Sequence, residues 1–371
     1  HFRKVEIPKI DKLEAFITGD KGRTESTRQR YRLTITQFYL WLLLTNRLEA
    51  FNADKLSLKK DLEEYSNYLL IRMAFKEGNP LKLKRNTVVS YLTAVRQYYK
   101  HREEQTADSK TPVINKAKHL KNPKLRTTKL TEKKPISRTQ KDDLLKQVNT
   151  DVLAAREEYS KALEAFNRID TYKGTAQAKA QRQVNKAKLK LTGALRDRAI
   201  IFITYYHGLR VSEVHHLNKN DITQEHEHPA LKILAKGQDE KQPIPLIKTA
   251  AKALIEYLDF YKVKDTEPLF KCLSGINKGG RLSKVSISQT VKALFKKASI
   301  ITEAMTDIDK KAFTAHSLRH SFGTHLIKQG ATIQETRQAL RHKNLSRTQI
   351  YVSHVEAEEA FKNPINTILE N

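Results

Sequence analysis

HSLRHSFGTH, residues 316–325, is the stretch of this sequence that decides the fold, and it does so together with two others. One is GLRVSE at residues 208–213, and the other is LRHKNLSRTQIY at residues 340–351. None is specific alone, because a single buried arginine is most often half of an ion pair and a single tyrosine most often packs in a core. The information lies in their order and spacing: an arginine, then a histidine with an arginine three residues later, then a histidine with a tyrosine nine residues later.

In this order the stretches resemble those of the tyrosine recombinases, the lambda-integrase and Xer-like family. The resemblance covers residues 137–371 as a catalytic domain, and residues 1–105 look like the family's helical core-binding domain. It implies a fold that is mainly α with a small antiparallel β-sheet, arranged as a two-domain clamp around DNA. The implied activity is site-specific cleavage and rejoining of DNA through a covalent 3′-phosphotyrosine intermediate, within a tetramer that holds two duplexes.

The chemistry of phosphodiester cleavage explains why these residue types are needed. Negative charge develops on a pentacoordinate phosphorus, and guanidinium groups stabilise it through paired hydrogen bonds to the non-bridging oxygens. Arg210 and Arg319 fit that role. A phenol that loses its proton as it attacks forms a phosphate ester that conserves bond energy for rejoining. By resemblance, Tyr351 is this nucleophile.

The remaining roles come from the resemblance. Lys236 stands at a predicted hairpin turn, where the family has the lysine that protonates the departing 5′ hydroxyl, and Lys241 is the competing candidate. His316 would accept a proton near the tyrosine, and His342 would donate to a phosphate oxygen. Glu213, one turn after the first arginine, is placed to orient it. The scheme requires no metal and no cofactor.

The sequence departs from the family pattern at three positions. His207 and Arg341 stand where the family commonly has Thr and Gly, and Gln242 stands where an arginine is frequent. None of the three is among the six reactive residues. Activity is therefore still expected, with altered local packing or DNA contacts.

The composition favours a polyanionic partner. The chain has 371 residues, with 69 Lys and Arg against 41 Asp and Glu, a formal net charge of +28. Its one cysteine, Cys272, excludes an intrachain disulfide and zinc ribbons or fingers, and favours a reducing compartment. No apolar run approaches the roughly 20 residues of a membrane helix. We therefore expect a cytoplasmic, nucleoid-associated protein with no membrane partner.

Helical periodicity and turn signals predict the domain organisation. Three helices are expected in the first domain, over 26–46, 57–73 and 84–102. Over 106–136 the periodicity stops, and three prolines with nine Lys or Arg predict a basic linker that crosses the DNA backbone, with a solvated tether as the alternative.

The catalytic domain, 137–371, is predicted to contain a helical hairpin insertion over 151–191 that turns near Gly174. A β-hairpin is expected over 230–246. The expected helices are 137–149, 194–207, 248–260, 285–298, 317–329 and 332–341. The tail, 355–371, has two apolar faces separated by Pro364. By resemblance the tail docks on a neighbouring protomer, and packing on its own domain is the alternative.

The expected partner is double-stranded DNA with inverted half-sites. Candidate contacts are cations of the third helix, the linker and the hairpin turn, namely Lys84, Arg85, Arg96, Lys100, Lys121, Lys124, Arg126 and Lys241. Of the helical hairpin only the second arm suits DNA, since 171–191 has six Lys or Arg and no acid. A hairpin packed on itself with solvated lysines is an equal alternative.

A topoisomerase, an architectural DNA-binding protein and a metal site are the alternatives to the recombinase. A type IB topoisomerase shares nearly the same chemistry, but His316 and the small helical first domain favour the recombinase. A non-catalytic architectural DNA-binding protein is opposed by the complete six-residue set. A histidine cluster could suggest a metal site, but it lacks the spacing of a known zinc motif. Its members are His207, His215, His216, His226 and His228.

Overall fold

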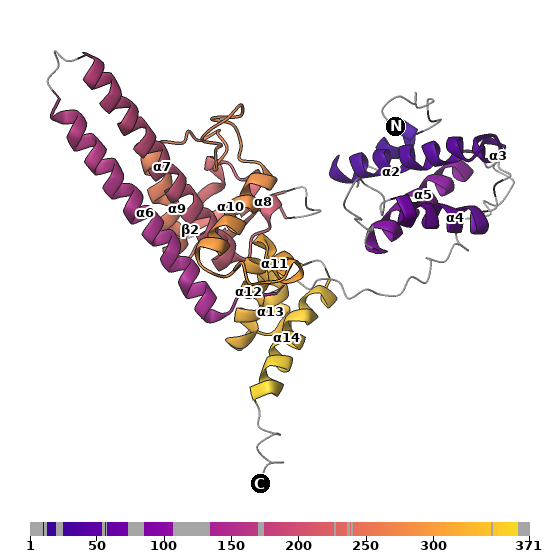
Figure 1. Ribbon diagram of the computed structural model, residues 1–371. Coiled ribbons are helices and arrows are strands. Elements are labelled where there is room, and N and C mark those ends of the chain that lie inside the picture. Colours follow the sequence, from indigo (N-terminus) through magenta and orange to yellow (C-terminus); the bar gives the residue numbers. More distant parts are fainter. Residues whose placement is uncertain are drawn as a thin grey trace, which may run out of the picture. The chain divides into compact units, whose positions relative to one another are not determined.

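The chain divides into two compact units, residues 1–130 and 131–371 (Figure 1). The computed structural model describes residues 10, 13–19, 25–53, 56, 58–72, 85–106, 134–169, 174–225, 228–235, 238, 240–342 and 344–362. The predicted linker, 106–136, therefore lies almost wholly outside the described residues.

The first unit is helical around an aromatic core. Its helices are α1 (Leu13–Thr18), α2 (Glu25–Leu44), α3 (Leu48–Asn52), α4 (Leu58–Arg72) and α5 (Arg85–Thr106). Phe38 of α2 lies at the centre, with its ring centroid 5.0 Å from that of Tyr65 and 5.8 Å from that of Phe51. Edge-to-face aromatic packing of this kind adds to the hydrophobic burial. The three predicted helices correspond to α2, α4 and α5.

The second unit contains nine further helices in its described residues and one short 3-10 helix. The α-helices are α6 (Arg138–Asn167), α7 (Gly174–His207), α8 (Val211–His216), α9 (Lys248–Tyr261), α10 (Lys284–Lys297), α11 (Asp307–Ala312), α12 (Ala315–Lys328), α13 (Ile333–Ala339) and α14 (Ser346–Lys362). Figure 1 shows α6 and α7 side by side along most of their length. α12, α13 and α14 pack together at one end of the unit.

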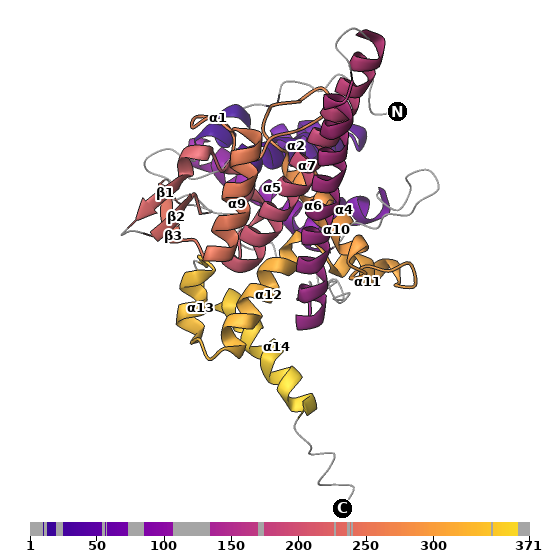
Figure 2. The same cartoon turned by 90° about the vertical axis from the view of Figure 1, so that its left-hand side faces the viewer.

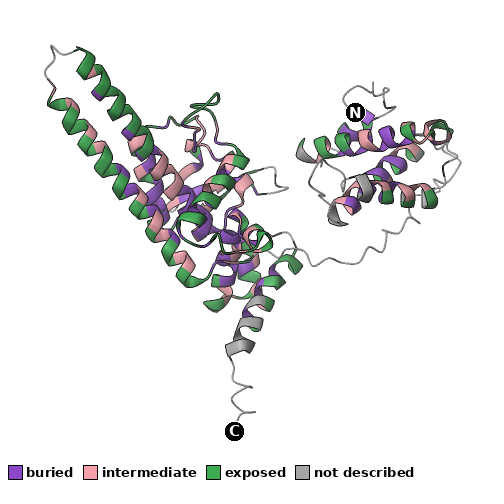
Figure 3. Cartoon of the chain, viewed as in Figure 1, coloured by how far each residue is buried: buried purple, intermediate pink, exposed green. Residues whose placement is uncertain are grey.

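The predicted helical hairpin over 151–191 is present, but as part of two longer helices and not as a separate element. Its arms are the outer parts of α6 and α7, two helices of 30 and 34 residues. A capping box starts α6, in which Ser137 Oγ accepts from the backbone N of Gln140 at 3.1 Å. α7 continues through Gly193 because Leu191, Leu195 and Ala199 stay on one buried face across it. Figure 3 shows that the outer ends of both helices are mainly exposed.

A cluster of ion pairs holds α6, α7 and α9 together. Glu256 of α9 accepts from Arg156 of α6 through one carboxylate oxygen and from Arg198 of α7 through the other. Directly after Arg198, α7 is buried along Ala199–Ile203 and forms the centre of the unit's core. The base of the hairpin is therefore anchored, whereas its outer end projects from the unit (Figure 1).

The sheet has three antiparallel strands in the order β1-β2-β3. β1 (Ile222–Glu225) pairs with β2 (His228–Ile233), which pairs with β3 (Gln242–Pro245) at the register Ile233 to Gln242. The predicted β-hairpin corresponds to β2 and β3. β1 was not predicted, because ITQE is short and mostly polar. Figure 2 shows the sheet at the edge of the second unit.

No helix of the described ranges is long and apolar enough to span a membrane.

Candidate active site

The first candidate arginine is placed by a sharp corner after α7. α7 ends at His207, and Gly208 follows with a φ of +57°, a left-handed conformation that favours glycine. A Cβ on Gly208 would lie 2.5 Å from Cδ1 of Phe322, so the corner has no room for a side chain. The chain then enters α8 with Arg210 at the N-cap position. Gly208 therefore determines where Arg210 enters the site.

Glu213 holds Arg210 from one turn further along α8. Nη1 of Arg210 donates to Oε1 of Glu213 at 2.6 Å, and the backbone N–H of Arg210 donates to Oε2 at 2.9 Å. Nη2 of Arg210 donates to the carbonyl oxygen of Arg341 at 3.5 Å. The two hydrogen bonds that Glu213 accepts from Arg210 are those that an orienting carboxylate makes.

Arg319, in α12, is the most buried of the site's arginines, with a side chain 2% exposed. It donates to the carbonyl oxygens of Gly208 and Leu340, and its Nη1 lies 3.9 Å from Oε2 of Glu213. Burial, together with the nearby charge of Arg210, lowers the pKa of Arg319 to about 9. The guanidinium therefore keeps its charge at neutral pH.

A third arginine, Arg341, reaches the same carboxylate. Its Nη2 donates to Oε2 of Glu213 at 3.1 Å and to the carbonyl oxygens of His207 and Gly208 at 3.2 and 3.3 Å. Its Nη1 donates to the carbonyl oxygen of Ala339 at 2.9 Å. From the sequence Arg341 was only a departure from a family pattern, because nothing local to residue 341 indicates a contact 128 positions away.

Glu213 is thus the centre of an arginine cluster. Burial alone would raise its pKa, but the Arg341 guanidinium, the backbone N–H of Arg210 and the charges of Arg210 and Arg319 bring that pKa below its ordinary value. The carboxylate is ionised at neutral pH, so three guanidinium groups share one negative charge. The resulting excess of two positive charges suits a bound anion such as a phosphodiester.

Tyr351, in α14, lies beside this cluster and is 2% exposed. Its ring packs on Gly323 of α12, where a Cβ would lie only 2.9 Å from Cζ of the tyrosine. Burial raises the pKa of Tyr351, although the charges of Arg319 and Arg210 act in the opposite direction. The phenol therefore keeps its proton in this arrangement.

His342 lies between α13 and α14, with its ring nearly parallel to that of Tyr351 and 6.3 Å from it. Its Nδ1 is 3.0 Å from the hydroxyl of Thr348. Burial, with the charges of Arg319 and Arg210, lowers the pKa of His342 to about 3. The imidazole is therefore neutral at physiological pH.

The other predicted histidine, His316, is exposed at the start of α12. Its ring lies 5.7 Å from that of His320, and the ring of His320 lies 5.5 Å from that of Tyr351. His320 thus lies beside the tyrosine, and it was not predicted from the sequence. Its spacing of four residues from His316 in a helix was the available signal.

Of the two candidate lysines, Lys236 lies outside the described residues. Lys241 is described, and its Nζ contacts both carboxylate oxygens of Asp221, at 2.5 and 2.6 Å. Asp221 is buried, so this ion pair engages Lys241 with the 3-10 helix Lys219–Asp221.

The remaining predicted DNA contacts are only partly described. Lys84, Lys121, Lys124 and Arg126 lie outside the described residues, and Arg85 starts α5 with a side chain that is not described. Burial lowers the pKa of Arg96, which is half-buried. Lys100 is exposed and forms an ion pair with Glu104 at 3.3 Å.

The histidines that could suggest a metal site lie in different surroundings where the structure describes them. His207 is buried beside Arg341, whereas Nδ1 of His215 is 2.8 Å from the carbonyl oxygen of Leu282. His226 lies outside the described residues. Across the described ranges, no group of three or more His, Cys, Asp or Glu is arranged to hold a metal ion.

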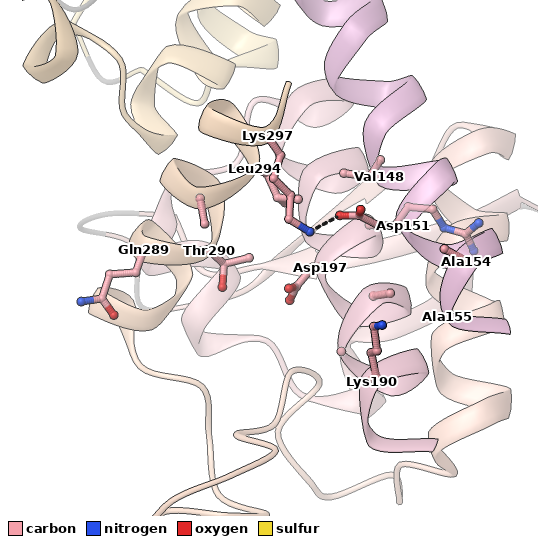
Figure 4. A pocket seen from close by; sticks show the side chains of 14 residues that line it. Val148, Asp151, Ala154, Ala155, Lys190, Asp197, Gln289, Thr290, Leu294 and Lys297 are labelled. Carbon is pink, nitrogen blue, oxygen red and sulfur yellow. Dashed lines mark hydrogen bonds and ion pairs between the residues drawn. The ribbon is translucent and has the colours of Figure 1, made fainter. Parts of the chain in front are cut away.

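A separate pocket of about 640 Å³ lies between α6, α7 and α10 (Figure 4). An ion pair of 2.8 Å between Lys297 and Asp151 crosses it and ties α10 to α6. None of the five predicted catalytic residues that the structure describes lines this pocket.

Comparison with known proteins shows which family this chain is similar to. Residues 177–358 match the phage integrase family. The tyrosine recombinase XerD of Listeria monocytogenes serotype 4b (strain F2365) is 33% identical over 173 residues, which are 45% of this chain and 54% of that protein. The tyrosine recombinase XerC of Rickettsia peacockii (strain Rustic) is 32% identical over 177 residues, 46% of this chain and 52% of that protein. The matched segment thus spans about half the length of these relatives.

Solved structures show the same fold at lower identity. A XerH site-specific recombinase bound to a palindromic difH substrate, in a post-cleavage complex, matches 94% of this chain and 82% of its own with a TM-score of 0.59 and 18% identity. The Tn1549 transposon integrase in complex with transposon right end DNA matches 93% of this chain and 96% of its own, with a TM-score of 0.52 and 17% identity.

Proposed function

We propose that this chain, whose residues 177–358 match the phage integrase family, is a site-specific tyrosine recombinase that cleaves and rejoins DNA strands. One observation carries the proposal. Arg210, Arg319, His342 and Tyr351 come from distant parts of the sequence and meet around one buried excess of positive charge.

In the proposed reaction, the phenolic oxygen of Tyr351 attacks the phosphorus of a DNA phosphodiester. A bond forms between these two atoms and the bond from phosphorus to the 5′ oxygen breaks, which leaves a 3′-phosphotyrosine linkage and a free 5′ hydroxyl. Arg210 and Arg319 bind the non-bridging oxygens and stabilise the charge that develops on them. Rejoining is the reverse attack by a 5′ hydroxyl on the phosphotyrosine.

Two protons have to move in this scheme. The phenol of Tyr351 loses its proton as it attacks, and His316 is the proposed acceptor; the ring of His320 lies 5.7 Å from that of His316 and 5.5 Å from that of Tyr351. The 5′ oxygen gains a proton from Lys236, an assignment supported by the engagement of Lys241 with Asp221.

His342 is proposed to donate a hydrogen bond to a non-bridging oxygen. A neutral imidazole has one donor and one acceptor nitrogen. If Nδ1 accepts the hydroxyl proton of Thr348, Nε2 carries the imidazole proton and is free to donate. A neutral His342 can therefore contact the phosphate without itself transferring a proton.

We further propose that the partner is double-stranded DNA with inverted half-sites, and that four protomers hold two duplexes. Two structural neighbours support DNA as a partner, since XerH and the Tn1549 integrase were solved with DNA. The tail is proposed to dock in trans. α14 reaches Lys362, Val355 packs inward, and the side chains beyond Glu356 lie outside the described residues.

Replacement of Tyr351 by Phe tests the central proposal, because it removes only the phenolic oxygen. The DNA is first selected by the chain from a pool of random duplexes, and the selected duplex is then nicked near its centre to trap cleaved protein. Wild type is expected to become covalently attached, while Tyr351→Phe binds with unchanged affinity and forms no adduct. A covalent adduct in the variant would contradict the assignment of the nucleophile, and none in wild type would contradict the proposed function.

A further inference from the structure

We propose that Arg341 is a positioning residue of the reaction, which fixes the turn carrying His342 against the segment carrying Arg210. This inference rests on the proposed function. It concerns a position that stood out in the sequence only as a departure from the pattern of the family that the chain resembles.

Residue 341 both donates hydrogen bonds to the segment that carries Arg210 and accepts one from it. Its side chain donates to the carbonyl oxygens of His207 and Gly208 and to Oε2 of Glu213. Its own carbonyl oxygen accepts from Nη2 of Arg210. Residue 341 thus joins the Arg210 segment as a donor through its side chain and as an acceptor through its carbonyl oxygen.

Burial makes these contacts strong and specific. The Arg341 side chain is 11% exposed, and its partner carboxylate, that of Glu213, is 1% exposed. A buried guanidinium without partners is costly, so the chain gains by keeping all of these hydrogen bonds at once. Arg319 joins the same two segments through Gly208 and Leu340, so Arg341 acts as a second tie beside it.

The backbone conformation of Arg341 is unfavourable for arginine, so the hydrogen bonds of its side chain to the Arg210 segment are kept at a cost in stability. Its φ is +54°, a left-handed conformation that is strained for any residue other than glycine. Glycine, which the family commonly has at this position, would remove that cost. The chain instead places there a side chain that reaches the catalytic segment, which is expected if the side chain has a role in the site.

Arg341 also affects the charge state of Glu213. Its guanidinium is the strongest of the influences that lower the pKa of that carboxylate. Loss of Arg341 should therefore raise the pH below which Glu213 becomes protonated and releases Arg210. The acidic limb of the pH–rate profile should move toward neutral pH.

The chain offers a matched control in Lys262. Lys262 has the same φ of +54°, is exposed at the end of α9, and carries one positive charge. Lys262→Gly and Arg341→Gly therefore remove the same charge and relieve the same backbone strain. Only the second removes contacts to the site.

The experiment uses the full chain and the nicked, selected duplex, with protein in saturating excess. Arg341→Gly is expected to bind DNA as tightly as Lys262→Gly, to cleave at least tenfold more slowly, and to show an acidic limb shifted upward. Arg341→Lys keeps the charge but not the forked geometry, so it should restore the acidic limb with only partial recovery of the rate. Thermal unfolding of each variant is measured alongside.

The outcomes separate the two levels of inference. No adduct with wild type contradicts the proposed function itself. If wild type reacts and Arg341→Gly has the rate and pH profile of Lys262→Gly, Arg341 is not a positioning residue. If Arg341→Gly does not fold, Arg341→Lys decides, because a wild-type rate in that variant also overturns the inference.

Discussion

Gly323 shows how one missing side chain places the proposed nucleophile. It lies inside α12, where alanine is favoured over glycine by about 1 kcal/mol. A Cβ there would, however, lie 2.9 Å from Cζ of Tyr351 and 3.0 Å from Cδ1 of Leu340. Both are closer than carbon atoms normally approach, so the ring bearing the nucleophile has to shift.

We therefore expect Gly323→Ala to lower the single-turnover cleavage rate at least tenfold with little change in DNA affinity. Gly193→Ala is the matched control, because Gly193 also lies inside a helix but its nearest neighbour to a new Cβ is Cδ1 of Leu273 at 3.7 Å. That variant should gain up to about 1 kcal/mol in unfolding free energy and cleave normally. Equal rates for the two variants would show that the tyrosine tolerates the displacement.

His207 predicts a pH dependence of stability. Burial, with the charge of Arg341, lowers the pKa of His207 to about 4. In the unfolded chain this imidazole binds a proton near pH 6.5, whereas in the folded chain it does so only near pH 4. Between these values the unfolded state binds more protons, so stability falls as pH decreases, by at most about 1.4 kcal/mol per pH unit for one group.

Replacement of His207 by Thr, the residue common in the family, should flatten this dependence. Denaturant unfolding of wild type and variant is compared at pH 8 and pH 5, and the quantity of interest is the difference between the two pH values, since a cavity would affect both equally. Wild type should lose more free energy of unfolding than His207→Thr. An identical loss would mean that His207 titrates normally in the folded chain.

The residues of the site were predictable to the extent that their roles depend on order in the sequence. Arg210, Arg319, His342 and Tyr351 were proposed from a family resemblance that rests on the order and spacing of three stretches, and the structure brings these four side chains together. His320 was missed because the resemblance points to His316, and only the packing of α12 against α14 shows that His320 lies beside the tyrosine. The contact of Arg341 with Glu213 was not predictable, because it depends on how two distant turns meet.

At the scale of elements, periodicity predicted most helices and misjudged where two of them end. Thr192 and Gly193 resemble a helix terminus, and a short break was expected after Asn149, yet α6 and α7 run on. Continuous apolar contact along their shared face outweighs the cost of a single interior glycine. The consequence is a long arm whose outer end is exposed (Figure 3).

The outer part of α7 carries a basic stripe, defined as Lys179, Arg182, Lys186 and Lys190. Their spacing places them on one side of the helix, and all four are exposed. Lys190 forms an ion pair with Glu158 of α6. For the other three, no ion pair is found in the described part of the chain, so they are available to an external anion.

If this stripe contacts the DNA backbone, neutralising it will reduce the salt dependence of binding. Each lost phosphate contact lowers the slope of log affinity against log salt concentration by about 0.9. Replacing Lys179, Arg182 and Lys186 together by Gln should therefore reduce the slope by nearly 3, as measured by fluorescence anisotropy. Lys188→Gln, on the opposite side of α7, serves as the control. An unchanged slope in the triple variant would favour the solvated-hairpin alternative.

At the scale of the whole molecule, the positively charged side chains are of two kinds, exposed and buried, and salt screens the two kinds to different extents. Most of the 69 Lys and Arg that give the net charge of +28 are spread over the sequence, and exposed members of this set are screened by salt over about 8 Å at physiological ionic strength. The arginines around Glu213 are buried, with Arg319 only 2% exposed. Buried charges are screened far less, so salt should affect binding and chemistry differently.

We expect binding to a duplex to weaken by about 10³-fold or more between 50 and 200 mM salt, as for proteins with six or more phosphate contacts. The cleavage rate of the fully bound complex should change less than about threefold, because the arginines that stabilise the transition state do not depend on the ionic atmosphere. Anisotropy gives the first quantity, and single-turnover cleavage of the nicked duplex at saturating protein gives the second. A cleavage rate that falls in parallel with affinity would mean that exposed cations, and not the buried cluster, hold the reacting phosphate.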